Sequence, residues 1–213
     1  MYKRQEDDEN KYLKIIDYKS GKQKFDFAKI FHGLQMQLII YMNAMMELYE
    51  KKTGKRVYPA GMFYLHMDDP IVNVEHENEA EHKILKDLKM SGVVNEDFQL
   101  IDHMEHTGSE GYLTLPVRAT KNGYDKRSSV LNTTQLFNLG RIVEKKMTEL
   151  GNSLMHGDIS IKPYEYEGRK PCEYCEFKNI CAYEDGVDQV EKIKKVSLEE
   201  GKHALDQTTA ESH

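Results

Sequence analysis

The sequence predicts an α/β fold, in which a central mixed sheet is flanked by two long helices. The first observation behind this prediction is a strand pattern at Tyr12–Tyr18, which turns sharply at the Ser-Gly pair that follows. The second is the apolar and aromatic run Val57–Met67, which is typical of a buried strand. The third is a pair of segments, Phe27–Lys52 and Thr133–Met155, whose apolar residues recur three and four apart as in amphipathic helices.

Residues at the ends of the two helices support these assignments. Asp26 is placed to cap the start of the first helix, and Gly54 to end it. Thr133 or Thr134 is placed to cap the second. The second helix has the more continuous apolar stripe, which comprises Leu136, Leu139, Ile142, Val143, Met147, Leu150 and Leu154.

Shorter elements are expected in the rest of the chain. The pattern predicts a charged helix at Glu75–Met90, a short irregular segment at Glu96–Glu105 and a strand at Tyr112–Arg118. The basic residues in the turn-rich stretch 121–127 are expected to be solvated. From residue 187 the chain is polar, and we expect it to be flexible beyond Leu198.

The composition is that of an ordinary globular protein of 213 residues, with 31% charged and 39% hydrophobic residues. No apolar run is long enough to span a bilayer, and the first residues lack the apolar segment of a secretory signal, so we expect a cytoplasmic location. The net charge of −6 disfavours a freestanding, non-specific DNA-binding protein, although it allows a local groove for nucleic acid.

The strand around Asp17 carries the first candidate site. Asp17 and Lys19 are two residues apart, so they point to the same side of the strand, with Leu13 and Ile15 further back on that face. A carboxylate that can hold Mg²⁺, beside a lysine that can orient a water, is the smallest apparatus for metal-assisted phosphodiester hydrolysis. An Asp-x-Lys tripeptide also occurs by chance on solvated strands, so the pair needs support from elsewhere in the chain.

The three cysteines form the second candidate site. Cys172, Cys175 and Cys181 have the spacing C-x2-C-x5-C, which favours metal ligation over a disulfide framework or buried free thiols. We expect their three sulfurs to converge. A tetrahedral zinc ion or a 4Fe–4S cluster needs four ligands, and the chain has no fourth cysteine. A histidine or a residue outside this chain would have to complete the site.

Five strings of residues, in this order, resemble the RecB-family nucleases of the PD-(D/E)xK superfamily. Within that family they are most similar to the C-terminal nuclease domain of the AddB-type chain of AddAB helicase–nucleases. The resemblance covers roughly residues 10–183. The strings are Ile-Asp17-Tyr-Lys19-Ser-Gly21, Gly33-Leu-Gln-Met-Gln37-Leu-Ile-Ile-Tyr41, Pro59-Ala-Gly-Met-Phe-Tyr-Leu-His66, Lys126-Arg-Ser-Ser129 and Pro171-Cys-Glu-Tyr-Cys175.

The resemblance implies roles for some of the matching residues. Asp17 would bind Mg²⁺ through its carboxylate, and Tyr18 through its backbone carbonyl. Lys19 would orient the attacking water, while Gln37 and Tyr41, one helical turn apart, would contact the scissile strand. The three cysteines Cys172, Cys175 and Cys181 would ligate a 4Fe–4S cluster.

The resemblance also implies the biological setting. The substrate would be DNA and the partner an AddA-type helicase–nuclease subunit, in double-strand-break repair by homologous recombination. The implied fold is a restriction-endonuclease-like core over 1–165, with an insertion at about 68–125. A cysteine-rich iron–sulfur segment over 166–186 and a flexible tail over 187–213 would follow.

Two parts of the family pattern are missing on the N-terminal side. The family has an acidic metal ligand on the strand before Asp17 and a first cysteine before the core, and nothing before Asp17 matches either. We therefore expect the first strand to be missing through truncation, residues 1–5 to be non-native, and the activity of this chain to be impaired.

Three other functions remain open from the sequence. One is a freestanding RecB-like exonuclease, such as those associated with CRISPR systems, although the insertion between His66 and Arg118 favours the AddAB type. Another is a non-catalytic domain that binds DNA or a partner, which the intact pair of Asp17 and Lys19 disfavours. The last is a zinc-binding interaction module around the cysteines, which metal analysis would distinguish from an iron–sulfur site.

Overall fold

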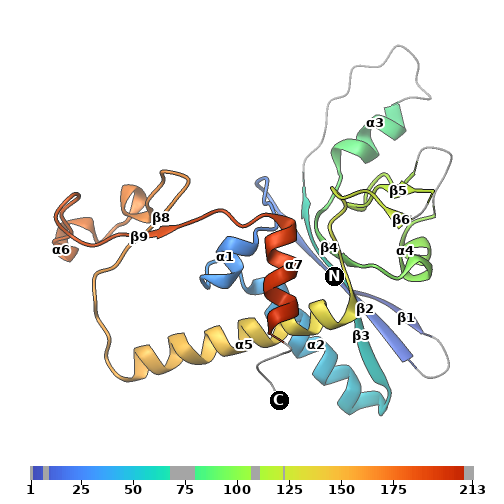
Figure 1. Ribbon diagram of the computed structural model, residues 1–213, viewed down its shortest axis with the longest axis horizontal. Coiled ribbons are helices and arrows are strands. Elements are labelled where there is room, and N and C mark those ends of the chain that lie inside the picture. Colours follow the sequence, from blue (N-terminus) through green and yellow to red (C-terminus); the bar gives the residue numbers. More distant parts are fainter. Residues whose placement is uncertain (1, 7–9, 68–79, 107–110, 122, 209–213) are drawn as a thin grey trace.

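The computed structural model describes residues 2–6, 10–67, 80–106, 111–121 and 123–208, with the backbone alone for 2–6 and 81. Its centre is a five-stranded sheet in the order β1-β2-β3-β4-β7 (Figure 1). The strands are β1 (Tyr2–Glu6), β2 (Asn10–Lys19), β3 (Arg56–His66), β4 (Ser91–Asn95) and β7 (Val130–Leu131). Pairing is antiparallel for β1–β2 and β3–β4 but parallel for β2–β3 and β4–β7. The predicted α/β fold with a mixed sheet is therefore confirmed.

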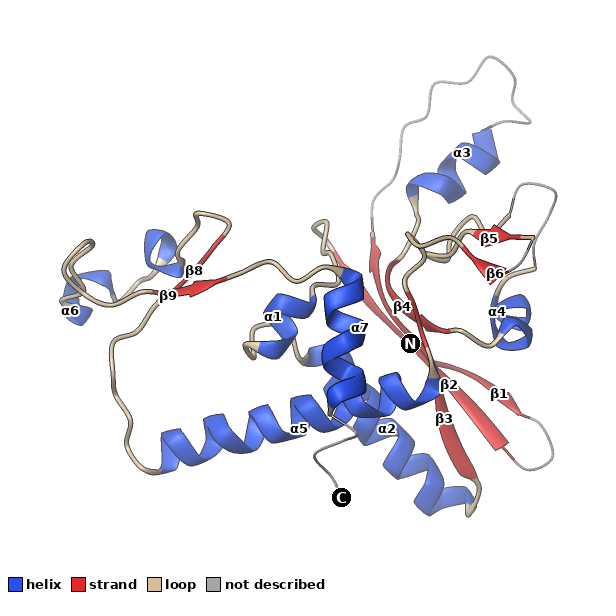
Figure 2. Ribbon diagram, viewed as in Figure 1, coloured by secondary structure: helices blue, strands red, loops and turns tan. Residues whose placement is uncertain are grey.

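Helices cover both faces of this sheet (Figure 2). One face packs against α1 (Phe27–Phe31), α2 (Gln37–Thr53), α5 (Thr133–Met155) and α7 (Leu198–Gln207). The other side carries α3 (Ala80–Asp87), α4 (Phe98–Met104) and the small hairpin of β5 (Ala119–Thr120) and β6 (Gly123–Tyr124).

A separate projection, which we call the arm, spans residues 164–193. It contains β8 (Tyr164–Tyr166), the 3₁₀ turn η2 (Pro171–Tyr174), α6 (Lys178–Cys181) and β9 (Glu191–Ile193). The chain enters the arm from the far end of α5 and returns through α7, which packs near the start of α5 (Figure 1).

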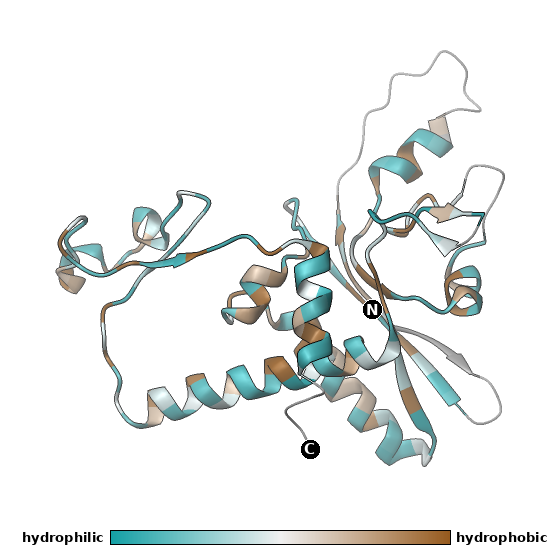
Figure 3. Cartoon of the chain, in the orientation of Figure 1, coloured by the Kyte–Doolittle hydropathy of each residue, from teal (hydrophilic) through white to brown (hydrophobic). Residues whose placement is uncertain are grey.

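Two hydrophobic clusters hold these layers together. Leu13 and Ile15, predicted to lie on the same face of the strand as Asp17, are both buried in the cluster beneath α1, α2 and α5. Phe63 and Ile101 belong to the cluster on the opposite face of the sheet. Figure 3 shows that apolar residues on the helices alternate with charged ones, as expected for surface helices with one buried side. No helix among the described residues is both long enough and apolar enough to cross a bilayer.

The prediction of one helix over Phe27–Lys52 is wrong, because the chain breaks between α1 and α2. Gly33 has a φ of +81°, a left-handed conformation that interrupts the helix. The Gln35 side chain then stabilises the break, since its Oε1 accepts from Asp26 N at 2.9 Å and its Nε2 donates to Lys24 O at 2.8 Å. The predicted caps Asp26 and Gly54 are confirmed at the start of α1 and the end of α2.

A strand precedes Asn10, although the sequence analysis expected the first strand to be missing. Tyr2 of β1 lies opposite Ile15 of β2, and Glu6 lies opposite Lys11. Asp17 is therefore two positions beyond the last described pair of this ladder.

The segment 112–118 is not the predicted strand. Three of its backbone N–H groups donate to a side chain instead of to a neighbouring strand. The Glu105 carboxylate accepts the N–H groups of Leu113, Thr114 and Leu115 at 2.7, 2.9 and 2.9 Å. Leu115 and Val117 are buried, but they lie in a loop. The alternation of apolar residues that suggested a strand therefore indicates which side chains are buried and not how the backbone is paired.

The predicted insertion at 68–125 and the irregular segment at 96–105 also need correction. Strand β4 lies within the first range and pairs with β3 in the central sheet, so this part belongs to the core. Residues 98–104 form α4, because Asp97 caps the helix by accepting from Gln99 N and Leu100 N. The predicted helix at Glu75–Met90 is present as α3, while 68–79 lie outside the described residues.

The prediction of a flexible tail is wrong for residues 198–207, which form α7. A capping box between Ser197 and Glu200 starts this helix, and Leu205 is fully buried against the core. Asn138 of α5 donates to the backbone oxygen of Leu205 at 2.9 Å. The sequence did not indicate this helix because only one short apolar side of it is buried.

Helix α5 has the predicted bounds, but its cap is Asn132 rather than Thr133 or Thr134. Near its start α5 crosses α2, the helix that carries Gln37 and Tyr41. At the crossing Asn43 Nδ2 donates to Gly140 O at 3.2 Å. A Cβ at position 140 would lie 2.6 Å from Asn43 Oδ1, so the Asn43 amide would have to leave this contact to make room for it.

We predict that Gly140→Ala lowers the free energy of unfolding by about 1–3 kcal/mol, because the added methyl group overpacks the α2–α5 contact. Gly151→Ala is the matched control on the same helix, since a Cβ there meets nothing within 4 Å. It should raise stability by about 0.5–1 kcal/mol through helix propensity. Urea denaturation measures both, and equal effects of the two variants would contradict this account of the crossing.

Candidate active site

Strand β2 brings Asp17 and Lys19 together at its C-terminal end. Lys19 Nζ lies 2.9 Å from Asp17 Oδ2, and the two side chains are 33% and 18% exposed. The prediction that the two side chains share one face of the strand is therefore confirmed.

The start of α2 adds Gln37 and Tyr41 to this pair. Lys19 Nζ donates to Gln37 Oε1 at 2.9 Å, and Gln37 Nε2 donates to the Tyr41 hydroxyl at 3.0 Å. The four residues thus form a continuous polar chain from the sheet edge to the helix surface, where Tyr41 is 47% exposed. The predicted meeting of Gln37 and Tyr41 with Asp17 and Lys19 is confirmed.

The parallel pairing of β2 and β3 sets the position of this end of the strand. Asp17 lies opposite Tyr64 and Lys19 opposite His66, while Met67 N donates to Lys19 O at 2.9 Å. These contacts fix the backbone around Lys19 against the end of β3.

One oxygen of the Asp17 carboxylate is poised for a further interaction. Oδ2 is buried and accepts no hydrogen bond among the described residues, because the nearby Lys19 ammonium satisfies the ion-pair distance but not hydrogen-bond geometry. Carboxylate oxygens suit a hard cation such as Mg²⁺, which at this position would share Asp17 with the Lys19 ammonium. Within the described part of the chain, however, no three His, Cys, Asp or Glu side chains gather into a group that could hold a metal ion.

Tyr64 is a site residue that the sequence analysis missed. Burial, together with the negative charge of Asp17, raises the pKa of Tyr64 to about 12. The neutral ring lies beneath Lys19, whose Nζ is 5.7 Å from the ring centroid. Only the register between β2 and β3 reveals this neighbour, and the sequence does not specify that register. The side chain of Tyr18, by contrast, is 42% exposed, so any metal contact would come from its backbone.

The three cysteines lie in the arm, away from the sheet (Figure 1). Cys172 and Cys175 share the η2 turn, where Cys175 N lies 3.5 Å from Cys172 O, and Cys181 ends α6. All three are free thiols. Within the described residues they do not gather into a cluster of side chains that could hold a metal ion. The expected convergence of the sulfurs is therefore not present. The segment buries no residue between 171 and 181, so local turns alone hold it.

Comparison with known proteins agrees with this geometry. A profile of the PD-(D/E)XK nuclease superfamily matches residues 4–182. The chain therefore belongs to that superfamily.

Curated relatives place the chain more narrowly. It is homologous to AddB proteins, which are chains of an ATP-dependent helicase/deoxyribonuclease by name. The Clostridium tetani protein is 37% identical over 186 residues, which are 85% of this chain and 16% of the relative. The Lachnoclostridium phytofermentans protein is 34% identical over 208 residues, or 92% and 18%. The Ruminiclostridium cellulolyticum protein is 34% identical over 176 residues, or 81% and 15%. The chain thus spans less than a fifth of the length of these relatives.

Proposed function

We propose that this chain is a Mg²⁺-dependent deoxyribonuclease domain that cleaves single-stranded DNA. The observation that carries the proposal is the polar chain from Asp17 through Lys19 and Gln37 to Tyr41. The superfamily match supports the reaction class, and the names of the relatives support DNA as the substrate.

The names of the relatives support one part of a biological setting, which is a helicase/deoxyribonuclease with more than one subunit. We propose that the domain acts in the cytoplasm within an AddAB-type helicase–nuclease, beside an AddA-type subunit, in double-strand-break repair by homologous recombination. Its homology to long helicase/deoxyribonuclease chains favours this setting over a freestanding exonuclease.

The residues at the end of β2 suit a magnesium ion. Asp17 would hold it through the buried oxygen that accepts no hydrogen bond, and the carbonyl of Tyr18 is the second proposed ligand. Mg²⁺, when bound, would polarise the scissile phosphate and lower the pKa of a bound water.

The side chains around this oxygen have separate roles. Lys19 would orient the attacking water and oppose the negative charge that develops on the phosphate. Its ammonium is already fixed by Asp17 and Gln37, so it needs little reorganisation during the reaction. Tyr41, exposed at the end of the polar chain, would contact the scissile strand.

Within the described residues, Asp17 is not part of a group of three or more metal-binding side chains. An ion bound by one carboxylate and one carbonyl keeps many waters and a loose position. We therefore propose that the isolated 213-residue chain cleaves weakly, and that the upstream acidic ligand of the superfamily pattern is needed for full activity.

We predict Mg²⁺-dependent cleavage of a labelled single-stranded oligonucleotide by the chain extended upstream with its genomic sequence. Asp17→Ala or Lys19→Ala should lower the rate by about 10²–10³-fold, because each removes a group that stabilises the transition state. Gel electrophoresis of the products, with Mg²⁺ or with EDTA, measures the effect.

Lys126→Ala is the control, because this lysine lies in the exposed turn that follows β6. It removes one positive charge and should leave the rate unchanged. Equal cleavage before and after Asp17→Ala would show that β2 does not carry the active site.

We further propose that Cys172, Cys175 and Cys181 supply three ligands of a 4Fe–4S cluster. The C-x2-C-x5-C spacing supports this, as does the shared turn of the first two cysteines. The sulfurs as placed do not fit a cluster, so the proposal requires the arm to rearrange around the metal.

We predict that anaerobic reconstitution of the upstream-extended chain gives iron and acid-labile sulfide in equal amounts, close to four of each per chain. Cys175→Ala should abolish incorporation, whereas Ser160→Ala, outside the arm, should not. Stoichiometric zinc without sulfide would instead support an interaction module.

A further inference from the structure

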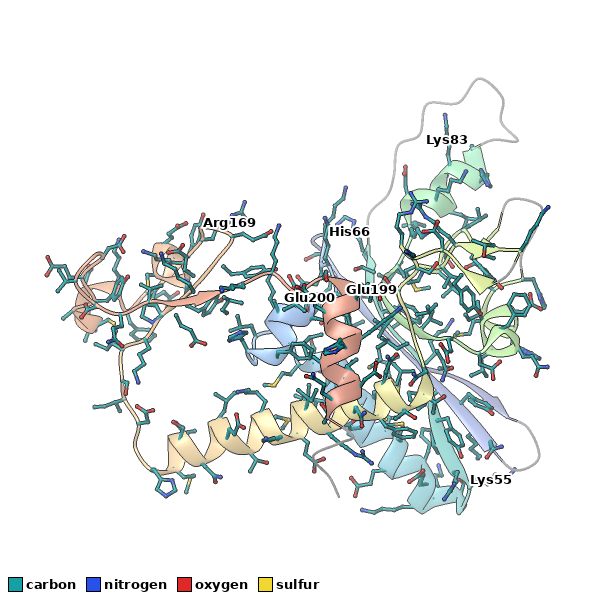
Figure 4. The ribbon with its side chains drawn as sticks, in the orientation of Figure 1. Lys55, His66, Lys83, Arg169, Glu199 and Glu200 are labelled. Atoms are coloured by element: carbon teal, nitrogen blue, oxygen red, sulfur yellow. The ribbon has the colours of Figure 1, made fainter. Side chains whose placement is uncertain are left out.

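A polar cleft of about 820 Å³ separates the arm from the core, and we call it the arm cleft. One wall is the connection from β2 to α1, including Lys22 and Lys24. The other wall comes from the turn at 166–169 and the segment 195–200 that enters α7. Figure 4 places Arg169 on the arm and Glu200 at the start of α7.

Three of the positive charges that line the arm cleft form no ion pair among the described residues. Lys22, Lys24 and Arg169 form no ion pair with any carboxylate in the part of the chain that the structure describes. Lys29 lies over the ring of Tyr166, 5.2 Å from its centroid, and its charge interacts with the Glu167 carboxylate without forming an ion pair. Of the cations lining this cleft, Lys195 alone is paired among the described residues, with Glu167.

The carboxylates of the cleft, by contrast, are occupied by hydrogen bonds. Asp26 accepts from the Tyr166 hydroxyl at 2.6 Å and from Lys29 N at 3.3 Å. Glu200 accepts from Ser197 N and Oγ, both at 2.8 Å. The lining nevertheless has more cations than carboxylates, with Lys22, Lys24, Lys29, Arg169 and Lys195 against Asp26, Glu167 and Glu200. The net positive charge of the cleft favours a polyanionic ligand.

The walls of the cleft are held in place before any ligand binds. Tyr166 and Ile193 of the arm pack against Ala28 of α1 in one buried cluster. Phe25 N donates to Ser91 Oγ at 2.9 Å, which ties the β2–α1 connection to the start of β4. A preformed site loses less conformational entropy on binding than a loose one does.

The arm cleft opens beside the candidate active site. Lys22 follows Lys19 by three residues, across the turn at Ser20 and Gly21. One row across the sheet also joins the two sites, because Asp17 lies opposite Tyr64 and Tyr64 lies opposite Ser91, which lines the cleft. A strand whose backbone occupied the cleft would therefore lead directly to Asp17 and Lys19.

We propose that the arm cleft binds the sugar–phosphate backbone of single-stranded DNA and guides the strand to Asp17 and Lys19. This inference rests on the proposed nuclease function and assigns its substrate-binding surface to Lys22, Lys24 and Arg169. These residues contact phosphates and therefore bind without regard to base sequence.

The test is fluorescence anisotropy of a labelled single-stranded oligonucleotide with the 213-residue chain, in EDTA and at several salt concentrations. Lys22→Gln/Lys24→Gln should raise Kd about tenfold at low salt and lower the salt slope by about 1.4, since each phosphate contact on a single strand contributes about 0.7. Arg169→Gln should weaken binding by a smaller factor and lower the slope by about 0.7.

Lys121→Gln/Lys126→Gln is the matched control, because it removes two charges from the exposed basic turn. It should change neither the affinity nor the slope. Circular dichroism melts that match the parent's confirm that each variant is folded. Parent-like binding by Lys22→Gln/Lys24→Gln, or equal losses in cleft and control variants, would overturn the proposal.

Asp17→Ala separates this proposal from the nuclease function. It should bind the oligonucleotide as the parent does, because Asp17 lies outside the arm cleft. Cleavage that is insensitive to the cleft variants would refute the cleft and leave the nuclease standing. Binding through the cleft, together with no Mg²⁺-dependent cleavage by the upstream-extended chain, would refute the nuclease alone.

Discussion

The parallel pairing of β2 with β3 is the constraint on which the candidate site depends. Ten residue pairs, from Asn10 opposite Arg56 to Lys19 opposite His66, join the two strands. Parallel neighbours need a crossover connection, and here α1 and α2 provide it. Because α2 must run back along the sheet to reach the start of β3, its first residue, Gln37, comes to the end of β2 that carries Lys19. The polar chain of the site is thus a consequence of the topology.

The same crossover explains why the helix breaks before α2. The left-handed residue Gly33 redirects the chain after α1, and α2 begins four residues later with Gln37 pointing at Lys19. A continuous helix from Phe27 would not pass through this turn. The contact between Asn43 and Gly140 then sets α2 against α5. Because α2 carries Gln37, this helix–helix contact also helps to position the candidate active site.

Sequence patterns were sufficient where one face of an element is buried along its length. They predicted β2, β3 and α5, and period and spacing paired Asp17 with Lys19 and Gln37 with Tyr41. The resemblance to the RecB-family nucleases, rather than any local pattern, implied that the two pairs meet. They failed where side chains replace regular backbone bonding. Glu105 holds the loop at 112–118, and nothing in the local pattern of that loop indicates a distant carboxylate. The neighbour Tyr64 and the cleft formed with Arg169 depend on tertiary contacts, so neither was predictable from spacing alone.

Asp17 is the proposed ligand of the catalytic metal. Mn²⁺ shares the preference of Mg²⁺ for oxygen ligands, and it broadens the NMR signals of nearby amides. In a Mn²⁺ titration of the isotope-labelled chain, the account predicts selective broadening of the amides around Asp17, Tyr18 and Lys19 and at Gln37. Asp17→Asn should abolish this broadening. Broadening centred elsewhere, or unchanged in Asp17→Asn, would contradict the account.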